Sequence, residues 1–149
     1  GISDVNHDLW DYDIASPPII HNLEIEGKLF ETVIALTKTG NVILLDRNNG
    51  KPIFDLRYRK APISDVPNEI TAKYQLDLEK PEKFSKVGFS KNDFNQLSSE
   101  KIEQIEKIIK ESKIGWFEAP SFKKDLIIFG LHGGAQWPGG AIDPYKHEL

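Results

Sequence analysis

The pattern of hydrophobic and polar positions predicts an extended conformation for the first third of the chain. Between residues 17 and 54, runs of Ile, Val, Leu and Thr are broken by Gly27, by Thr39-Gly40 and by Asn49-Gly50. Runs of strand length interrupted by residues that accept a positive φ indicate antiparallel strands joined by tight turns. We therefore expect three or four consecutive strands before residue 55.

The pattern becomes helical between residues 98 and 115. Four isoleucines recur there at helical spacing, with Glu100 early in the segment and lysines near its end: Ile102, Ile105, Ile108 and Ile109. We expect one helix whose apolar stripe packs on a sheet.

The segment before this helix, residues 57–91, is rich in charged residues and prolines and has little periodicity. It predicts a long irregular excursion. Ser90 followed by Asp93 predicts a short helical turn at its end.

Two further strands are expected near the end of the chain. "DLIIFGL", from Asp125, has the character of a buried strand, and the glycine-rich "HGGAQWPGGAID" leads into another. "LLDRNNGKPIF" from Leu44 and "AIDPYKHEL" from Ala141 echo each other, which predicts a repeating unit that the chain includes only in part.

Composition narrows the class of protein. The chain has 149 residues, is 39% hydrophobic and carries a net charge of -4 with no basic stripe, so we expect a folded domain without nucleic acid as a partner. No apolar run is long enough to cross a bilayer, so we expect any membrane attachment to lie outside these residues. The absence of cysteine excludes disulfides, thiolate metal sites and cysteine nucleophiles. Since the chain begins Gly-Ile-Ser and has no methionine, we expect a piece of a longer protein.

The candidate chemistry begins with "HDLWDYD" at residues 7–13. In an extended segment, residues i and i+2 face the same way, so Asp11 and Asp13 would present two carboxylates to one side. These carboxylates repel unless a cation lies between them; a hard ion such as calcium fits, and one carboxylate could also accept a proton. A solvated acidic loop is the alternative, since two carboxylates make an incomplete metal shell.

Other candidates are less specific. Lys38 ends a hydrophobic strand just before a turn, where an exposed lysine is common. His7, His21 and His132 have no ligand spacing, so a three-histidine metal site is not expected. The glycines of "HGGAQWPGG" would allow close backbone approach to a flat ligand, or would mark a tight strand connection.

Taken in order, five segments resemble one family. "HDLWDYD…PP", "TKTGNVILLDRNNGKPIF", "SDVPNE", the helical excursion and "GGAQWPGGAIDP" are similar to the pyrroloquinoline quinone (PQQ) dehydrogenases of the membrane-bound glucose dehydrogenase type. The resemblance implies an eight-bladed quinoprotein β-propeller with PQQ and a divalent ion at its centre. The chain would be mainly β with a helical insertion, a fragment of about two blades. It would comprise blade strands at 1–56, a loop and helical insertion at 57–118, and a strand with the start of the next blade at 119–149.

The resemblance also implies roles for individual residues. Asp11 would be the catalytic base that takes the proton from the substrate hydroxyl, and would bind the metal together with Asp13. Lys38, 27 residues after Asp11, would hydrogen-bond a quinone oxygen, where a fixed ammonium stabilises the reduced cofactor. Gln136 and Trp137 match a loop near the cofactor, with Gln136 in place of the usual Asn.

"LLDRNNGKPIF" resembles the tryptophan-docking motif that ties adjacent blades of the family. Leu44 would stand for the motif's small residue, Asn49 for its threonine and Phe54 for its tryptophan. These departures predict a weaker docking contact within the same strand arrangement.

At the level of function, the resemblance implies a quinoprotein dehydrogenase that oxidises a glucose-like sugar or an alcohol hydroxyl. Electrons would pass to ubiquinone or a cytochrome, on the periplasmic side, with any anchor to the inner membrane outside this chain. The metal could be calcium, magnesium or a lanthanide. We expect the isolated chain to lack it. We also expect the isolated chain to bind PQQ weakly or not at all and to be inactive. The alternative is a non-catalytic β-propeller that serves as a binding or assembly scaffold.

Overall fold

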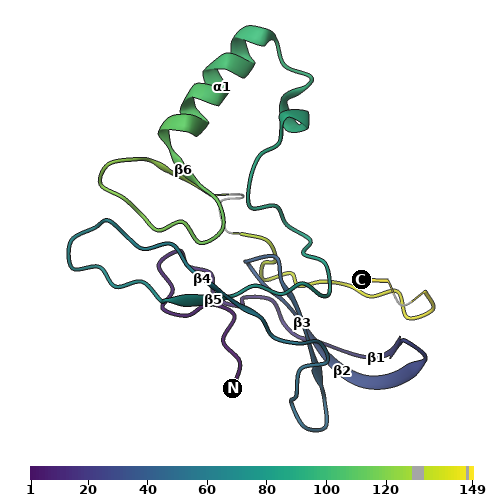
Figure 1. The fold of residues 1–149 in the computed structure, drawn as a ribbon. Helices are drawn as coiled ribbons and strands as arrows, with labels where there is room; N and C mark the ends of the chain where they lie inside the picture. The colour runs from purple at the N-terminus through teal and green to yellow at the C-terminus, as the bar shows by residue number, and fades with distance from the viewer. Residues whose placement is uncertain (129–132, 147) are drawn as a thin grey trace.

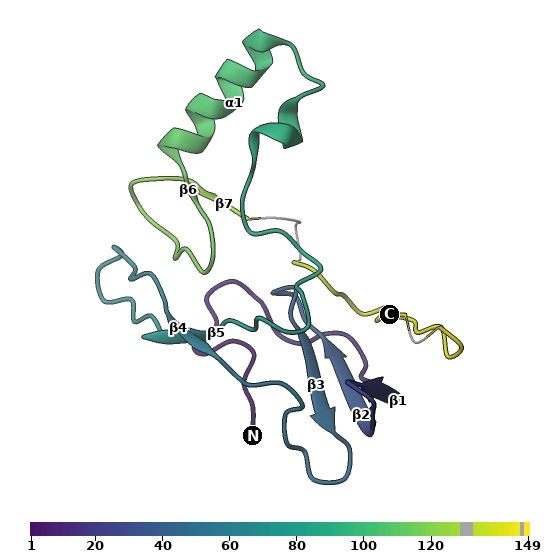
Figure 2. The ribbon, with the colours of Figure 1, turned by 45° about the vertical axis from the view of Figure 1, so that its right-hand side comes forward.

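The computed structural model describes residues 1–128, 133–146 and 148–149. Its main feature is an antiparallel sheet of three consecutive strands in the order β1-β2-β3 (Figures 1 and 2). The strands are β1 (Ile19–Ile25), β2 (Lys28–Leu36) and β3 (Val42–Asp46). This confirms the predicted run of strands.

The two turns of this sheet differ in length. Ile25 pairs with Lys28, so Glu26 and Gly27 alone connect β1 to β2, with φ of 52° and 76°. Both residues are left-handed, as a two-residue hairpin turn with matching twist requires. Leu36 pairs with Val42, so the connection from β2 to β3 is the longer segment 37–41, which carries Lys38.

Both faces of β3 pack against apolar side chains. On one face Val42 and Leu44 join Ile34, Leu36 and Ala135 in a core cluster. On the other face Ile43 packs with residues that follow the sheet in the chain, Leu76 and Leu78. The continuous apolar run of β3 follows from burial on both faces. The same cluster as Leu44 includes Phe54 and Ile142, so the two sequence pieces that echo each other meet in one core.

The predicted excursion contains a small hairpin and the expected helical turn. β4 (Tyr58–Lys60) pairs antiparallel with β5 (Tyr74–Leu76). The 3-10 helix η1 (Lys91–Phe94) follows Ser90, whose backbone N–H donates to the Asp93 carboxylate at 2.7 Å. This is the capping arrangement that the sequence predicted.

The predicted helix is present, but its predicted packing is wrong. α1 (Ser99–Glu111) has no buried residue, and Ile108 is 56% exposed. In both ribbon views α1 stands clear of the β1–β3 sheet (Figures 1 and 2). Periodicity identified the apolar face correctly, yet it contains no information about which surface covers that face.

The last part of the described chain has little regular structure. β6 (Lys113–Ile114) pairs parallel with β7 (Leu126–Ile127). The predicted strand "DLIIFGL" therefore appears in part, and its residues 129–131 lie outside the described residues. Within 133–146 and 148–149 the further predicted strand is reduced to a single bridge between Asp143 and Glu148. The division of the chain after residues 56 and 118 stays a prediction.

No described helix combines the length and hydrophobicity that crossing a membrane requires.

Candidate functional site

Lys38 joins the two aspartates that the sequence singled out. Its Nζ donates to the backbone carbonyl oxygen of Asp11 at 2.8 Å and to Oδ1 of Asp13, and lies 3.4 Å from Oδ2 of Asp11. Lys38 is 6% exposed, whereas the side chains of Asp11 and Asp13 are 86% and 59% exposed. Lys38 is thus a buried, paired cation instead of the exposed turn lysine that was the alternative.

The loop that carries Asp11 is shaped by Asp8. The Asp8 carboxylate accepts hydrogen bonds from the backbone N–H of Trp10 at 2.9 Å and of Tyr12 at 2.6 Å. Bonds of this kind let a short polar side chain replace backbone partners in a turn. Asp11 lies between these two donors with φ of 64°, a left-handed conformation that aspartate tolerates better than most residues. The carbonyl oxygen of Asp11 faces Lys38 from this position.

The electrostatics of the site keep Lys38 charged. Its hydrogen bond to Asp13 raises the pKa of Lys38 above 10.5, burial opposes the shift, and Asp11 adds to it. The sequence predicted that a cation must lie between Asp11 and Asp13, and the Lys38 ammonium takes that position in the described structure.

The described residues do not fit a resident metal ion. They contain no group of three or more histidine, cysteine, aspartate or glutamate side chains arranged to hold one. Asp11 and Asp13 already contact an ammonium, and two carboxylates supply only part of a shell of six to eight oxygens for an ion such as calcium. Metal binding by Asp11 and Asp13 stays a prediction, and no step below uses a metal.

Aromatic side chains fasten the same loop to the end of the helical insertion. The Trp10 ring packs edge-on against Phe117, with centroids 5.1 Å apart at 81°, and its Nε1 donates to the carbonyl oxygen of Glu118 at 2.7 Å. Tyr12 lies 6.3 Å from Phe117, again edge-on. Trp10 therefore serves packing, as expected for most tryptophans, and both ends of its ring system are engaged.

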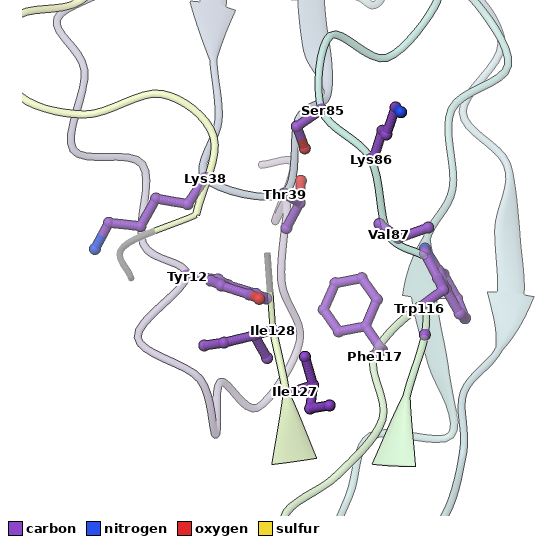
Figure 3. A pocket seen from close by; sticks show the side chains of 11 residues that line it. Tyr12, Lys38, Thr39, Ser85, Lys86, Val87, Trp116, Phe117, Ile127 and Ile128 are labelled. Atoms are coloured by element: carbon purple, nitrogen blue, oxygen red, sulfur yellow. The ribbon is translucent and has the colours of Figure 1, made fainter. Parts of the chain in front are cut away.

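A small cavity lies between the loop and the insertion (Figure 3). Its volume is about 40 Å³, and Tyr12, Lys38 and Thr39 line it together with Val87, Phe117 and Ile128. Pockets for small ligands usually measure about 300–1,000 Å³. This cavity is therefore too small to enclose a ligand of ordinary size.

The glycine-rich segment approaches the turn that carries Lys38. The backbone N–H of Gly134 donates to the Lys38 carbonyl oxygen at 2.6 Å, and that of Ala135 donates to Thr37 at 3.1 Å. A Cβ on Gly133, whose φ is 82°, would lie 2.6 Å from the same Lys38 oxygen. The glycines therefore allow a close approach between two segments of the chain, and their contact with a flat ligand stays a prediction.

The remaining predicted residues are placed less centrally. Gln136 is half-buried and directly follows the segment that bonds to the Lys38 turn. Trp137 is 78% exposed. Their contact with a cofactor stays a prediction, and His132 lies outside the described residues.

Sequence reasoning missed Asp4. This carboxylate is 4% exposed and accepts hydrogen bonds from Thr39 Oγ1 at 2.9 Å and from Asn41 Nδ2 at 2.8 Å. Burial raises the pKa of Asp4 above its ordinary 3.8, and the bonds from Asn41 and Thr39 oppose the shift. The available signal was the polar run "TKTGN" between two apolar strands, which needed a polar partner.

The described chain thus combines an open antiparallel sheet, one helix and a lysine held by two aspartates. The chain belongs to the PQQ family of glucose, ethanol and alcohol dehydrogenase β-propeller domains, because the sequence model of that family matches residues 3–149. This confirms the resemblance, and with it the mainly β fragment of a propeller. No solved structure matches the chain significantly.

Named relatives agree with this assignment. The chain is 31% identical to the quinoprotein glucose dehydrogenase of Gluconobacter oxydans (strain 621H), over 95% of this chain and 18% of that protein. It is 26% identical to the quinoprotein glucose dehydrogenase of Escherichia coli (strain K12), with the same two shares. It is 29% identical to the glycerol dehydrogenase large subunit of Gluconobacter thailandicus, over 95% of this chain and 20% of that protein. The chain thus spans about a fifth of the relatives it matches.

Contact of Lys38 and Asp11 with the cofactor that the family name implies stays a prediction, because the Lys38 ammonium already donates to three oxygens of the chain. PQQ carries quinone oxygens and carboxylates, and a buried ammonium beside an exposed carboxylate suits an anionic quinone and a substrate hydroxyl side by side. Lys38 would hold the cofactor, with Asp11 next to it.

Proposed function

We propose that the whole protein containing this chain is a PQQ-dependent dehydrogenase that oxidises a hydroxyl group of a sugar or an alcohol. The observation that carries this proposal is the contact of Lys38 with Asp11, whose Oδ2 and backbone oxygen lie 3.4 Å and 2.8 Å from Nζ. A carboxylate and an ammonium in contact can divide a dehydrogenation between them, one receiving the proton and the other stabilising negative charge.

Asp11 is suited to the role of base. Its side chain is 86% exposed, so a substrate hydroxyl can approach it. In the proposed reaction the hydroxyl proton moves to a carboxylate oxygen of Asp11 as the substrate carbon becomes a carbonyl carbon.

Lys38 is suited to fix negative charge. It is held by three oxygens and is almost fully buried, so its ammonium has little freedom to move. A charge that is already in place needs no reorganisation when electron density develops beside it. PQQ, when bound, would accept the hydride from the substrate carbon and so take up two electrons.

The relatives guide the substrate class and acceptor. Their names include glucose, glycerol and quinate dehydrogenases, and both quinate enzymes carry the word quinone in their names. We propose a glucose-like sugar first and other alcohols second, with electrons leaving to ubiquinone or a cytochrome. We also propose a periplasmic location, with any membrane anchor outside this chain.

The test is dye-linked dehydrogenase activity of the whole protein after reconstitution with PQQ, across a panel of sugars and alcohols. Asp11→Asn should lower kcat at least about 100-fold while PQQ stays bound, because the neutral amide cannot accept the proton. Asp55→Asn, at another exposed aspartate, is the matched control and should retain activity.

Two outcomes would contradict the proposal. Equal activity of Asp11→Asn and wild type would remove Asp11 from the reaction. A wild-type protein that binds no PQQ and oxidises none of the panel would favour a non-catalytic propeller that serves binding or assembly.

A further inference from the structure

A buried polar cluster lies directly behind the turn that carries Lys38. It is formed by Asp4, Thr37, Thr39 and Asn41, each at most 9% exposed. The Asp4 carboxylate accepts from Thr39 and Asn41, and Thr37 Oγ1 lies 2.7 Å from Thr39 Oγ1 and accepts from the Asn41 N–H at 3.1 Å. The cluster thus fixes the residues on both sides of Lys38.

Burying a carboxylate opposes folding, so the position of Asp4 needs an explanation. Two hydrogen bonds from side chains offset part of this cost, and both need an accepting oxygen at residue 4. Asp4 does not line the cavity beside Lys38, so it cannot touch a substrate there. What Asp4 does contact is the turn.

Asp4 also belongs to the segment that supplies Asp11 and Asp13. This segment therefore meets the turn twice, through Asp4 at Thr39 and Asn41, and through Asp11 and Asp13 at Lys38. Between these points, the backbone of Asn6 exchanges two hydrogen bonds with the buried Gln75 side chain, at 2.7 Å and 2.6 Å. The contacts of Asp4 and Asn6 therefore hold the segment before Asp11 in place relative to the turn, and so fix the distance between Asp11 and Lys38.

We propose that Asp4 is a positioning residue that holds the Lys38 turn at the distance from Asp11 which the reaction requires. This inference deepens the proposed function and rests on it for the reaction itself. The positioning of Lys38 can be tested separately, since it concerns contacts within this chain.

The test compares Asp4→Asn with wild type in the whole protein. The variant is isosteric, but it replaces one accepting oxygen by an NH₂ group, so one of the donors Thr39 and Asn41 loses its acceptor. The first measurement, without PQQ, is the rate at which an amine-acylating reagent labels Lys38, read by peptide mass spectrometry. We expect labelling about tenfold faster in Asp4→Asn, because the turn opens more often.

The second measurement is kcat per bound PQQ. We expect a fall of about tenfold or more in Asp4→Asn with the substrate KM unchanged, because misplacing a charge by a fraction of an ångström weakens its action at the reacting atoms. A residue with only a structural role would lower the amount of folded protein and leave kcat per bound PQQ as it is.

Thr32→Val is the matched control for general destabilisation. Thr32 is fully buried in strand β2 and donates to the His21 carbonyl oxygen at 2.6 Å, away from the Lys38 turn. We expect it to lower stability and to leave Lys38 labelling unchanged. If Asp4→Asn does not fold, Asn41→Ala removes one bond to Asp4 at a residue that does not line the cavity, and replaces it in both measurements.

The outcomes separate the two proposals. Equal labelling of Lys38 in Asp4→Asn and Thr32→Val overturns the positioning role. Faster labelling in a protein that shows no PQQ-dependent activity supports the positioning role and rejects the dehydrogenase. Faster labelling with unchanged kcat per bound PQQ overturns the link between position and reaction.

Discussion

The Nζ of Lys38 is closer to the backbone of Asp11 than to its carboxylate, with 2.8 Å to the carbonyl oxygen and 3.4 Å to Oδ2. The shorter contact involves only the backbone of Asp11, and asparagine tolerates the same left-handed conformation as aspartate. Asp11→Asn therefore removes the proposed base and leaves the cation in place, so a loss of activity in that variant reports on proton transfer.

Replacing Lys38 should have the converse effect. Lys38→Met keeps the buried length of the side chain and removes its charge, so Asp11 and Asp13 lose the cation between them. We expect PQQ-dependent activity of the whole protein to fall about 100-fold. Lys51→Met, at an exposed lysine, is the control and should change activity little. Full activity in Lys38→Met would exclude a catalytic role for the ammonium.

Asp8 should matter for the shape of the loop and not for proton transfer. Asp8→Ala removes both acceptors of the Trp10 and Tyr12 N–H groups, and we expect a loss of about 1 kcal/mol in the free energy of unfolding. Asp8→Asn keeps one acceptor and should lose less. Chemical unfolding of the whole protein measures both, and equal stabilities of Asp8→Ala and wild type would refute the capping role.

Gly133 and Gly27 form a matched pair for the approach of the glycine-rich segment. Both have positive φ, 82° and 76°, but a Cβ on Gly133 meets the Lys38 oxygen at 2.6 Å while one on Gly27 meets nothing within 4 Å. Gly27→Ala should cost about 1 kcal/mol from backbone strain alone. Gly133→Ala should cost clearly more, because neither backbone can yield. Similar unfolding midpoints for the two variants would contradict this account.

Asp4 should give stability a specific pH dependence. Burial raises the pKa of Asp4 above 3.8, so the folded state holds this proton more tightly than the unfolded state does. Its contribution to stability therefore declines as pH rises from about 3.8 through the folded pKa, and then stays constant. Asp4→Asn has no such proton. As pH rises through this range, the free energy of unfolding of wild type should therefore fall relative to that of Asp4→Asn. A pH-independent difference, measured by chemical unfolding, would be the contrary result.

The isolated chain should bind PQQ weakly. The cavity beside Lys38 has a volume of about 40 Å³, which is too small to bury a three-ring ligand. Titration calorimetry with PQQ should show no saturation at micromolar concentrations, in contrast to the whole protein. Tight binding by the isolated chain would mean that the described residues suffice for the site.

Local signals predicted local features of the fold. The Glu26-Gly27 turn and the capping of η1 by Asp93 each depend on residues within three positions of one another, and both were predicted. The contact of Lys38 with Asp11 spans 27 residues, and only the match to a known family drew attention to this spacing. Asp4 was missed because its partners lie 35 and 37 residues away, with no motif that links them.

The packing of α1 could not be predicted from its periodicity. Its apolar stripe is plain in the sequence, yet the described chain leaves Ile108 exposed. A periodic pattern identifies an apolar helix face, but which surface packs against that face depends on the rest of the fold.

The hydrogen bond from Trp10 to Glu118 joins residues 108 positions apart, and this has a consequence for the order of folding. Closing so large a loop costs more chain entropy than forming the β1–β2 hairpin, and non-local contacts of this kind form late. The turn with Lys38 can form with the early sheet, whereas the loop with Asp11 gains its second attachment only when the segment after α1 arrives. We therefore expect the turn that carries Lys38 to form before the loop that carries Asp11 gains its attachment at residue 118.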